Sequence, residues 1–172
     1  MTKILWVDFE MTGLDVQKER IIEVAALVSD LNFNELDQYH SVVHQDQNLL
    51  DRMDDWNKKT HAETGLLKKI QNGKKESVVD KELALFVRKN FAVEKPVLGG
   101  NSIGQDRLFI DAYLPEFSKS LHYRMLDVTS WKVIMANKFG IKFEKKNTHM
   151  ALDDIRESIS ELKHYLQYFK SP

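Results

Sequence analysis

The chain has 172 residues, a formal net charge of −1 and no cysteine. This length predicts a single domain, residues 1–172, that is large enough to bury a hydrophobic core. The absence of cysteine excludes disulfides, thiol catalysis and cysteine-ligated zinc. No apolar run approaches the length that spans a membrane, and the N-terminus has no signal-peptide pattern, so we expect a cytoplasmic protein.

The near-neutral charge also restricts nucleic-acid binding. Proteins that hold a long nucleic acid usually carry a clear basic excess, because their affinity comes from neutralising many phosphates. Any nucleic-acid ligand of this chain is therefore expected to be short.

Three segments at the start of the chain predict β-strands. They cover 3–10, 20–29 and 35–43, with a turn at 32–34 between the second and the third. The second of them is almost continuously apolar, which is typical of a strand inside a sheet.

Helical patterns and short strands alternate through the rest of the chain. A short strand is predicted at 96–100, and 121–128 is predicted as a strand or a loop. Helices are predicted at 48–53, 55–70 with a break near Gly65, 76–91, 103–114 ended by Pro115, 129–139 and 150–169. This order of elements predicts an α/β fold with a mixed sheet.

The first candidate site lies where the first strand ends. Asp8 and Glu10 are separated by Phe9, so both carboxylates point to the same face of the sheet. Two acids at the end of a buried strand are costly unless a cation holds them, and Mg²⁺ and Mn²⁺ prefer carboxylate oxygens. The alternative is a pair of solvated acids that begins a loop.

Two later segments carry candidates of the same kind. Asp106 falls near the start of a helix that follows a strand, where α/β sheets place their sites, although an acid there also suits the helix dipole. His149 lies at the mouth of the last predicted helix, where a surface histidine is the alternative. On that helix, about 100° of rotation per residue places Asp154 beside the apolar stripe and Asp153 toward water.

Together these residues resemble a known set. Four acids from three segments, with a histidine five positions before the last acid, are similar to the DEDDh family of 3′→5′ exonucleases. The similarity is closest to its oligoribonuclease branch, in segments 8–14, 53–65, 100–107, 122–128 and 149–162. The resemblance implies an RNase H-like fold, in which a mixed β-sheet is flanked by α-helices.

The resemblance and the chemistry of phosphodiester hydrolysis imply a role for each residue of this set. Asp8, Glu10, Asp106 and Asp154 would hold two Mg²⁺ or Mn²⁺ ions roughly 4 Å apart. His149 would act as general base and take a proton from the attacking water.

The resemblance also implies a substrate. Oligoribonucleases cut very short oligoribonucleotides, notably dinucleotides, to 5′-mononucleotides. Leu14 would lie between two bases, Trp56 would stack on one of them, and Tyr123 of a second subunit would stack on the other, since the family forms homodimers. The alternatives are that Leu14 covers the core, that Trp56 packs its own helix, and that Tyr123 is a strand residue with one end in water.

The 5′ phosphate would be bound by polar residues that exclude longer chains. The resemblance assigns Ser102, His61 and Arg124 to this role, with Arg124 again reaching across the dimer interface. Thr129 stands where the family often has serine, so its hydroxyl is a further candidate.

Two other functions stay open at this point. A DEDDh exonuclease that acts on longer RNA or DNA 3′ ends would need an open groove beyond the metal site. A metal-binding or scaffold protein that had lost catalysis would lack part of the catalytic set, and none of its five residues is missing from this chain.

Overall fold

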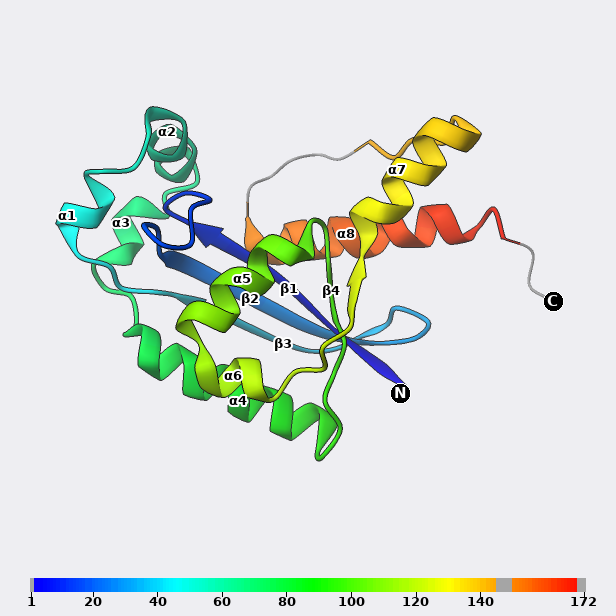
Figure 1. Cartoon of the computed structure of the whole chain (residues 1–172), viewed down its shortest axis with the longest axis horizontal. Coiled ribbons are helices and arrows are strands. Elements are labelled where there is room, and N and C mark those ends of the chain that lie inside the picture. Colours follow the sequence, from blue (N-terminus) through cyan, green and yellow to red (C-terminus); the bar gives the residue numbers. More distant parts are fainter. Residues whose placement is uncertain (1, 145–149, 170–172) are drawn as a thin grey trace.

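One five-stranded sheet organises the computed structural model, which describes residues 2–144 and 150–169 (Figure 1). The strands lie in the order β3-β2-β1-β4-β5. Their bounds are Lys3–Met11 for β1, Ile21–Asp30 for β2, Glu35–Val42 for β3, Leu98–Gly100 for β4 and Met125–Asp127 for β5. Because β1 is antiparallel to β2 and parallel to β4, the sheet is mixed, and the predicted α/β fold is confirmed.

Helices cover both faces of this sheet. Figure 1 shows α4, α5 and α6 on one face, α7 and α8 on the other, and α1 to α3 at the end to which β1 points. Their bounds are Gln47–Leu50, Asp55–Glu63, Leu67–Ile70, Glu76–Phe91, Ile103–Tyr113, Pro115–Lys119, Val128–Phe139 and Ala151–Leu166, for α1 to α8 in order. Within the described ranges, no helix combines the length and the apolar character needed to cross a membrane.

The helices differ from the prediction in one respect. Pro115 was expected only to end a helix, but it also begins α6, because a proline at the first helical position gives up an N–H that has no partner there in any case. The predicted break near Gly65 is confirmed, since this glycine has a left-handed φ of 73° between α2 and α3. The other predicted helices are confirmed, with ends that differ by at most three residues.

Alternation along β1 divides the core into two layers. Every second residue packs toward α4, α5 and α6, namely Leu5, Val7, Phe9 and Met11. Ile4 and Trp6 pack on the other face against α8. Asp8 and Glu10 continue this second series, so the two carboxylates face α8.

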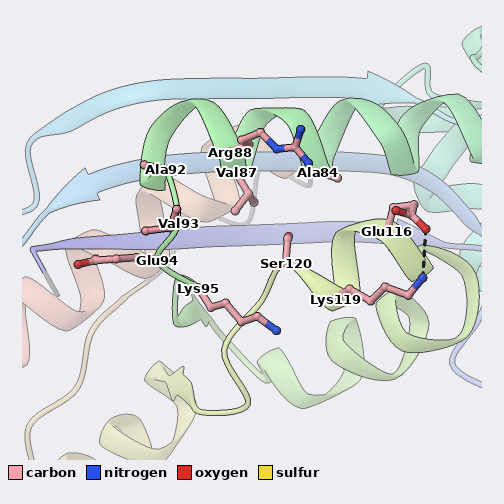
Figure 2. A pocket seen from close by; sticks show the side chains of 10 residues that line it. All are labelled: Ala84, Val87, Arg88, Ala92, Val93, Glu94, Lys95, Glu116, Lys119 and Ser120. Carbon is pink, nitrogen blue, oxygen red and sulfur yellow. Dashed lines mark hydrogen bonds and ion pairs between the residues drawn. The ribbon is translucent and has the colours of Figure 1, made fainter.

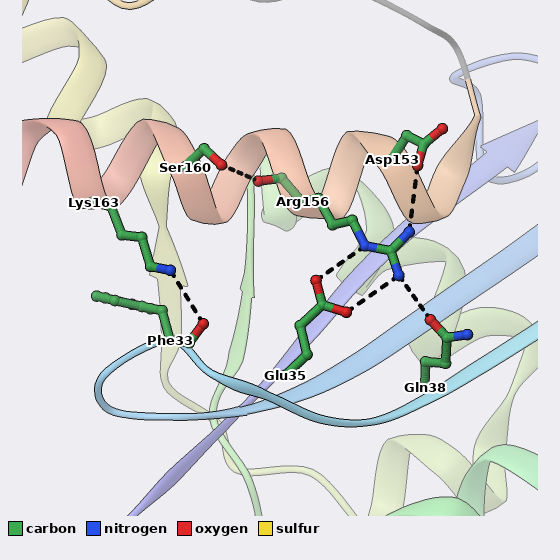
Figure 3. A network of polar contacts seen from close by, with 7 residues as sticks. All are labelled: Phe33, Glu35, Gln38, Asp153, Arg156, Ser160 and Lys163. Atoms are coloured by element: carbon green, nitrogen blue, oxygen red, sulfur yellow. Dashed lines mark hydrogen bonds and ion pairs between the residues drawn. The ribbon is translucent and has the colours of Figure 1, made fainter.

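Arg156 connects the start of α8 to β3, one of the two edge strands of the sheet (Figure 3). Its Nε and Nη2 donate to the two carboxylate oxygens of Glu35 at 3.0 and 3.2 Å, and Nη2 also donates to Oε1 of Gln38 at 2.9 Å. Its Nη1 reaches Oδ1 of Asp153 at 3.4 Å. A bidentate arginine–carboxylate pair fixes orientation as well as distance, so the first turns of α8, which carry Asp154, are held against the sheet.

Candidate active site

Three carboxylates meet where β1 ends and α8 begins. Three carboxylate oxygens, one each from Asp8, Glu10 and Asp154, all lie within 4.8 Å of one another. All three side chains are half-buried. As the phase of the helix predicts, Asp154 lies with the two strand acids, whereas Asp153 contacts Arg156. We call Asp8, Glu10 and Asp154 the carboxylate triad.

The electrostatics of the triad favour a bound cation. Burial raises the pKa of Glu10 to about 8, and the charges of Glu23, Asp154 and Asp106 add to this effect. Ionised carboxylates that are disfavoured in this way are stabilised by a cation placed among them. Carboxylate oxygens are hard ligands of the kind that Mg²⁺ and Mn²⁺ prefer, so the residues present fit a divalent metal ion.

Asp106 lies next to the triad but outside it. Its side chain is buried in the first turn of α5, and its Oδ1 accepts a hydrogen bond from the backbone N–H of Phe9 at 3.0 Å. Burial raises the pKa of Asp106 to about 7, against the lowering effect of the backbone N–H groups, and the charge of Asp127 also raises it. The charge of Asp106 in turn raises the pKa of Glu10, so the two carboxylates interact electrostatically.

The structure places His61 at the triad as well. This histidine of α2 is only 2% exposed. Its Nε2 donates to the carbonyl oxygen of Met11 at 3.1 Å, and its Nδ1 lies 4.0 Å from Oε2 of Glu10. The sequence had suggested a phosphate contact for His61 but no contact with Glu10. His149 lies outside the described residues, which resume at Met150, so its role stays a prediction.

The sequence analysis missed a contact between a carboxylate and a histidine beside the triad. Glu23 lies opposite Glu10 in the register of β1 and β2. Its Oε1 is 2.8 Å from Nε2 of His40 on β3, and both residues line a pocket that α8 closes on one side. A lone acid within the otherwise apolar run 21–28 was the signal that could have identified Glu23.

Ser102 and Thr129, two of the predicted phosphate contacts, lie together at the ends of β4 and β5. The backbone N–H of Ser102 donates to Oγ1 of Thr129 at 2.8 Å and to Oδ1 of Asp127 at 3.0 Å. The two hydroxyl oxygens are 3.2 Å apart. Ser102 has a left-handed φ of 51°, a strained conformation of the kind that clusters at ligand sites. We call Ser102 and Thr129 the hydroxyl pair.

Leu14 and Trp56 are both on the surface at this end of the sheet. Leu14 is 76% exposed in the loop after β1, and Trp56 is 65% exposed on α2. Neither side chain therefore has the core or helix-packing role that was the alternative reading. Gln105 of α5 donates to the carbonyl oxygen of Leu14 at 2.7 Å, which ties this loop to the helix that carries Asp106.

Tyr123 and Arg124 lie at the opposite end of the sheet. Met125 and Leu5 both pair with the same residue of β4, so they are level with each other. At about 3.3 Å per residue, Met125 lies about 16 Å below the level of Glu10, and the two residues before it lie further away. Within one subunit, neither side chain comes close to the triad. Tyr123 is 74% exposed, and the guanidinium of Arg124 lies 5.3 Å from its ring centre.

A surface pocket at this far end is separate from the site (Figure 2). The end of α4, the segment 92–95 and α6 line it. Its charged side chains have both signs, and Lys119 pairs with Glu116 at 3.1 Å. None of the predicted site residues lines this pocket.

Comparisons with known proteins find relatives that match almost the whole chain. A family model described as Exonuclease (RNase_T) matches residues 5–162. The chain is 44% identical over 169 residues to the oligoribonuclease of Francisella tularensis subsp. novicida, which covers 95% of this chain and 94% of the relative. It is 43% identical over 171 residues to the oligoribonuclease of Haemophilus influenzae, in an alignment that covers 96% of this chain and 94% of the relative.

Solved structures are similar in fold. Exonuclease I from Methylocaldum szegediense matches with a TM-score of 0.75 and 14% identity over 97% of this chain and 40% of that protein. A product-bound exonuclease I matches with a TM-score of 0.74 and 13% identity over 97% of this chain and 44% of that protein. The chain thus spans less than half the length of these larger proteins, which share its RNase H-like fold.

The family match and the relatives cover almost the same part of the chain. The matched residues include the whole carboxylate triad and Asp106. At 43–44% identity over about 95% of its length, the chain belongs to the exonuclease family and, within it, to the oligoribonucleases, which makes it a 3′→5′ exoribonuclease.

Proposed function

We propose that this enzyme degrades very short oligoribonucleotides, notably dinucleotides, to 5′-mononucleotides. The observation that carries the proposal is that three features lie at one end of the sheet: the carboxylate triad, the exposed Leu14 and Trp56, and the hydroxyl pair. A net charge of −1 suits a ligand with few phosphates. The curated relatives that are 43–44% identical bear the name oligoribonuclease, which supports the same substrate class.

The proposed reaction is hydrolysis with two divalent ions, Mg²⁺ or Mn²⁺. Asp8, Glu10 and Asp154 would hold them, and Asp106 would complete the set from α5. Such ions, when bound, supply an activated water and relieve charge on the phosphate. His149 would take the proton of the attacking water.

The proposed ligand contacts follow from exposure and position. Trp56 offers an exposed ring on which one base stacks, and a stack of this kind contributes about 1–3 kcal/mol. Leu14 would separate the two bases. The hydroxyl pair of Ser102 and Thr129, together with His61, would contact the 5′ phosphate and exclude a longer chain.

The remaining two contacts imply a homodimer. Tyr123 and Arg124 lie at the far end of their own sheet, so they can serve this function only in the active site of a second subunit. A cytoplasmic location, where short RNA fragments would be met, belongs to the same proposal.

A length series tests the proposed substrate. RNAs labelled at the 5′ end, from two nucleotides upward, are digested with Mg²⁺, and a matched DNA series serves as control. We expect kcat/KM to be highest for the RNA dinucleotide and to fall as the chain lengthens. Equal rates at all lengths would contradict the dinucleotide preference and favour an exonuclease of longer RNA or DNA 3′ ends.

A further inference from the structure

Asn101 lies between two parts of the proposed site. This half-buried residue follows β4 directly and precedes Ser102. Its Oδ1 accepts a hydrogen bond from Oγ1 of Thr129 at 3.3 Å. Its Nδ2 donates to Oγ of Ser158 at 2.7 Å and to Oε2 of Glu161 at 3.1 Å. One amide therefore contacts α7 on one side and α8 on the other.

On the side of α7, Asn101 orients a hydroxyl. Oγ1 of Thr129 already accepts the backbone N–H of Ser102 at 2.8 Å. Because a hydroxyl has one proton and two lone pairs, donation to Asn101 turns the lone pairs of Thr129 toward Ser102. The hydroxyl pair is then held in one arrangement, and the strained backbone of Ser102 is held with it.

On the side of α8, the contacts lead to the carboxylate triad. Oγ of Ser158 donates to the carbonyl oxygen of Asp154 at 2.9 Å. Glu161 is fully buried, and Tyr165 donates to its other oxygen at 2.8 Å. A buried carboxylate requires such partners, so the amide of Asn101 is fixed by a rigid part of the helix.

We propose that Asn101 is a positioning residue that holds the hydroxyl pair at a fixed place relative to Asp154. The inference rests on the proposed function, in which the hydroxyl pair contacts the 5′ phosphate and Asp154 binds a divalent ion. A dinucleotide places its 5′ phosphate and its scissile phosphate one nucleotide apart. A rigid connection between the two contacts would therefore select that length.

Three variants separate the two sides of the connection. Thr129→Val removes the hydroxyl on the side of α7, Ser158→Ala removes the bond to the Asp154 carbonyl, and Asn101→Ala removes both connections. Asn137→Ala is the matched control, because the Asn137 amide donates to the carbonyl oxygen of Val133 within its own helix α7.

Two measurements report on the two sides independently. The first is the ratio of kcat/KM for a 5′-phosphorylated dinucleotide to that for its 5′-hydroxyl counterpart. The second is Mn²⁺ affinity by calorimetry without substrate. We expect Thr129→Val to lower the ratio and Ser158→Ala to weaken Mn²⁺ binding. Asn101→Ala should do both, each by roughly three- to tenfold, the effect of one lost hydrogen bond.

Several outcomes would overturn the inference. If Asn101→Ala lowers the melting temperature but keeps the wild-type ratio and Mn²⁺ affinity, the residue is only structural. If the wild type shows no preference for the 5′ phosphate, the proposed phosphate contact fails and the inference fails with it. If Asn101→Ala does not fold, Thr129→Val and Ser158→Ala are combined: coupling through Asn101 predicts non-additive effects on kcat/KM, and additive effects contradict it.

Discussion

The backbone N–H of Phe9 donates to Oδ1 of Asp106 at 3.0 Å, across 97 positions of the chain. Phe9 stands between Asp8 and Glu10, so this bond sets the start of α5 against the strand that carries two members of the triad. The bond occupies one oxygen of Asp106, and the side-chain oxygen of an asparagine could accept it equally well.

Replacement of Asp106 by asparagine separates these two effects. Asp106→Asn retains the acceptor for Phe9 and removes the charge, so we expect kcat to fall roughly 10- to 100-fold. The melting temperature of the metal-free protein should stay constant or rise, because a buried carboxyl with a raised pKa becomes a neutral amide. Steady-state hydrolysis and thermal unfolding in EDTA measure both effects. Asp111→Asn, at an exposed acid of the same helix, is the control, and unchanged activity in Asp106→Asn would contradict a role in the site.

The raised pKa of Glu10 predicts how the metal-free protein responds to pH. Burial and the neighbouring acids raise this pKa from 4.5 to about 8, so between these values the folded state binds a proton more tightly than the unfolded chain. The stability that protonated Glu10 contributes is complete at low pH and is lost as the pH rises through about 8.

Chemical unfolding of the EDTA-treated protein between pH 5 and about 8 measures how the free energy of unfolding depends on the protonation of Glu10. We expect the free energy of unfolding to decrease as the pH rises. Saturating Mg²⁺ should offset this decrease, and Glu10→Gln should make the free energy of unfolding less dependent on pH. An identical pH slope in wild type and Glu10→Gln would show that Glu10 does not titrate in this range.

Trp56 predicts a binding effect without a stability effect. Because its ring is 65% exposed, Trp56→Ala should leave the melting temperature nearly unchanged. Loss of one base stack should raise KM for a dinucleotide by about 5- to 150-fold, which corresponds to about 1–3 kcal/mol. Trp56→Phe should retain most of the affinity. Leu85→Ala, at another exposed apolar side chain, is the control, and an unchanged KM in Trp56→Ala would rule out stacking there.

The opposite positions of the triad and Arg124 predict complementation between subunits. In the proposed homodimer, Asp8→Asn would inactivate the metal site of its own chain, and Arg124→Ala would largely inactivate the site of its partner. Each variant alone should be nearly inactive. In a mixed sample, half of the dimers are mixed and one site in each is intact, so about a quarter of wild-type activity should return. A mixture no more active than the average of its parts would contradict action across the interface.

His149 predicts a separation of binding from catalysis. His149→Ala should bind Mg²⁺ and a dinucleotide with nearly wild-type affinity, while hydrolysis slows by about 10²- to 10⁴-fold, the range of general-base catalysis. Calorimetry and single-turnover kinetics measure the two properties. His44→Ala, outside the site, controls for loss of a histidine, and full activity in His149→Ala would disprove the general-base role.

Local sequence patterns predicted the parts of the site that depend on one element at a time. Alternation along a strand placed Asp8 and Glu10 on one face, and helical phase placed Asp154 toward them. Contacts between two elements could not be predicted from such patterns. The position of Glu23 opposite Glu10 depends on strand register, and the contact of His61 with Glu10 depends on how α2 folds back over the end of β1.

Pro115 illustrates a limit of the same kind for the fold. A proline predicts that a helix cannot continue through it, but the same fixed φ suits the first position of a new helix. Which of the two occurs depends on the packing that follows. Here Phe117 of α6 is completely buried, and α6 forms directly after α5.

The arrangement of the triad sets an order of events in biosynthesis. Asp154 follows Glu10 by 144 positions, and α8 covers the face of the sheet that carries Ile4, Trp6, Ala25 and Leu27. A nascent chain on the ribosome can therefore pair β1 with β2 long before it can complete the triad or cover that face. The proposed metal site can form only when α8 has left the exit tunnel, so a nascent chain without α8 lacks that site.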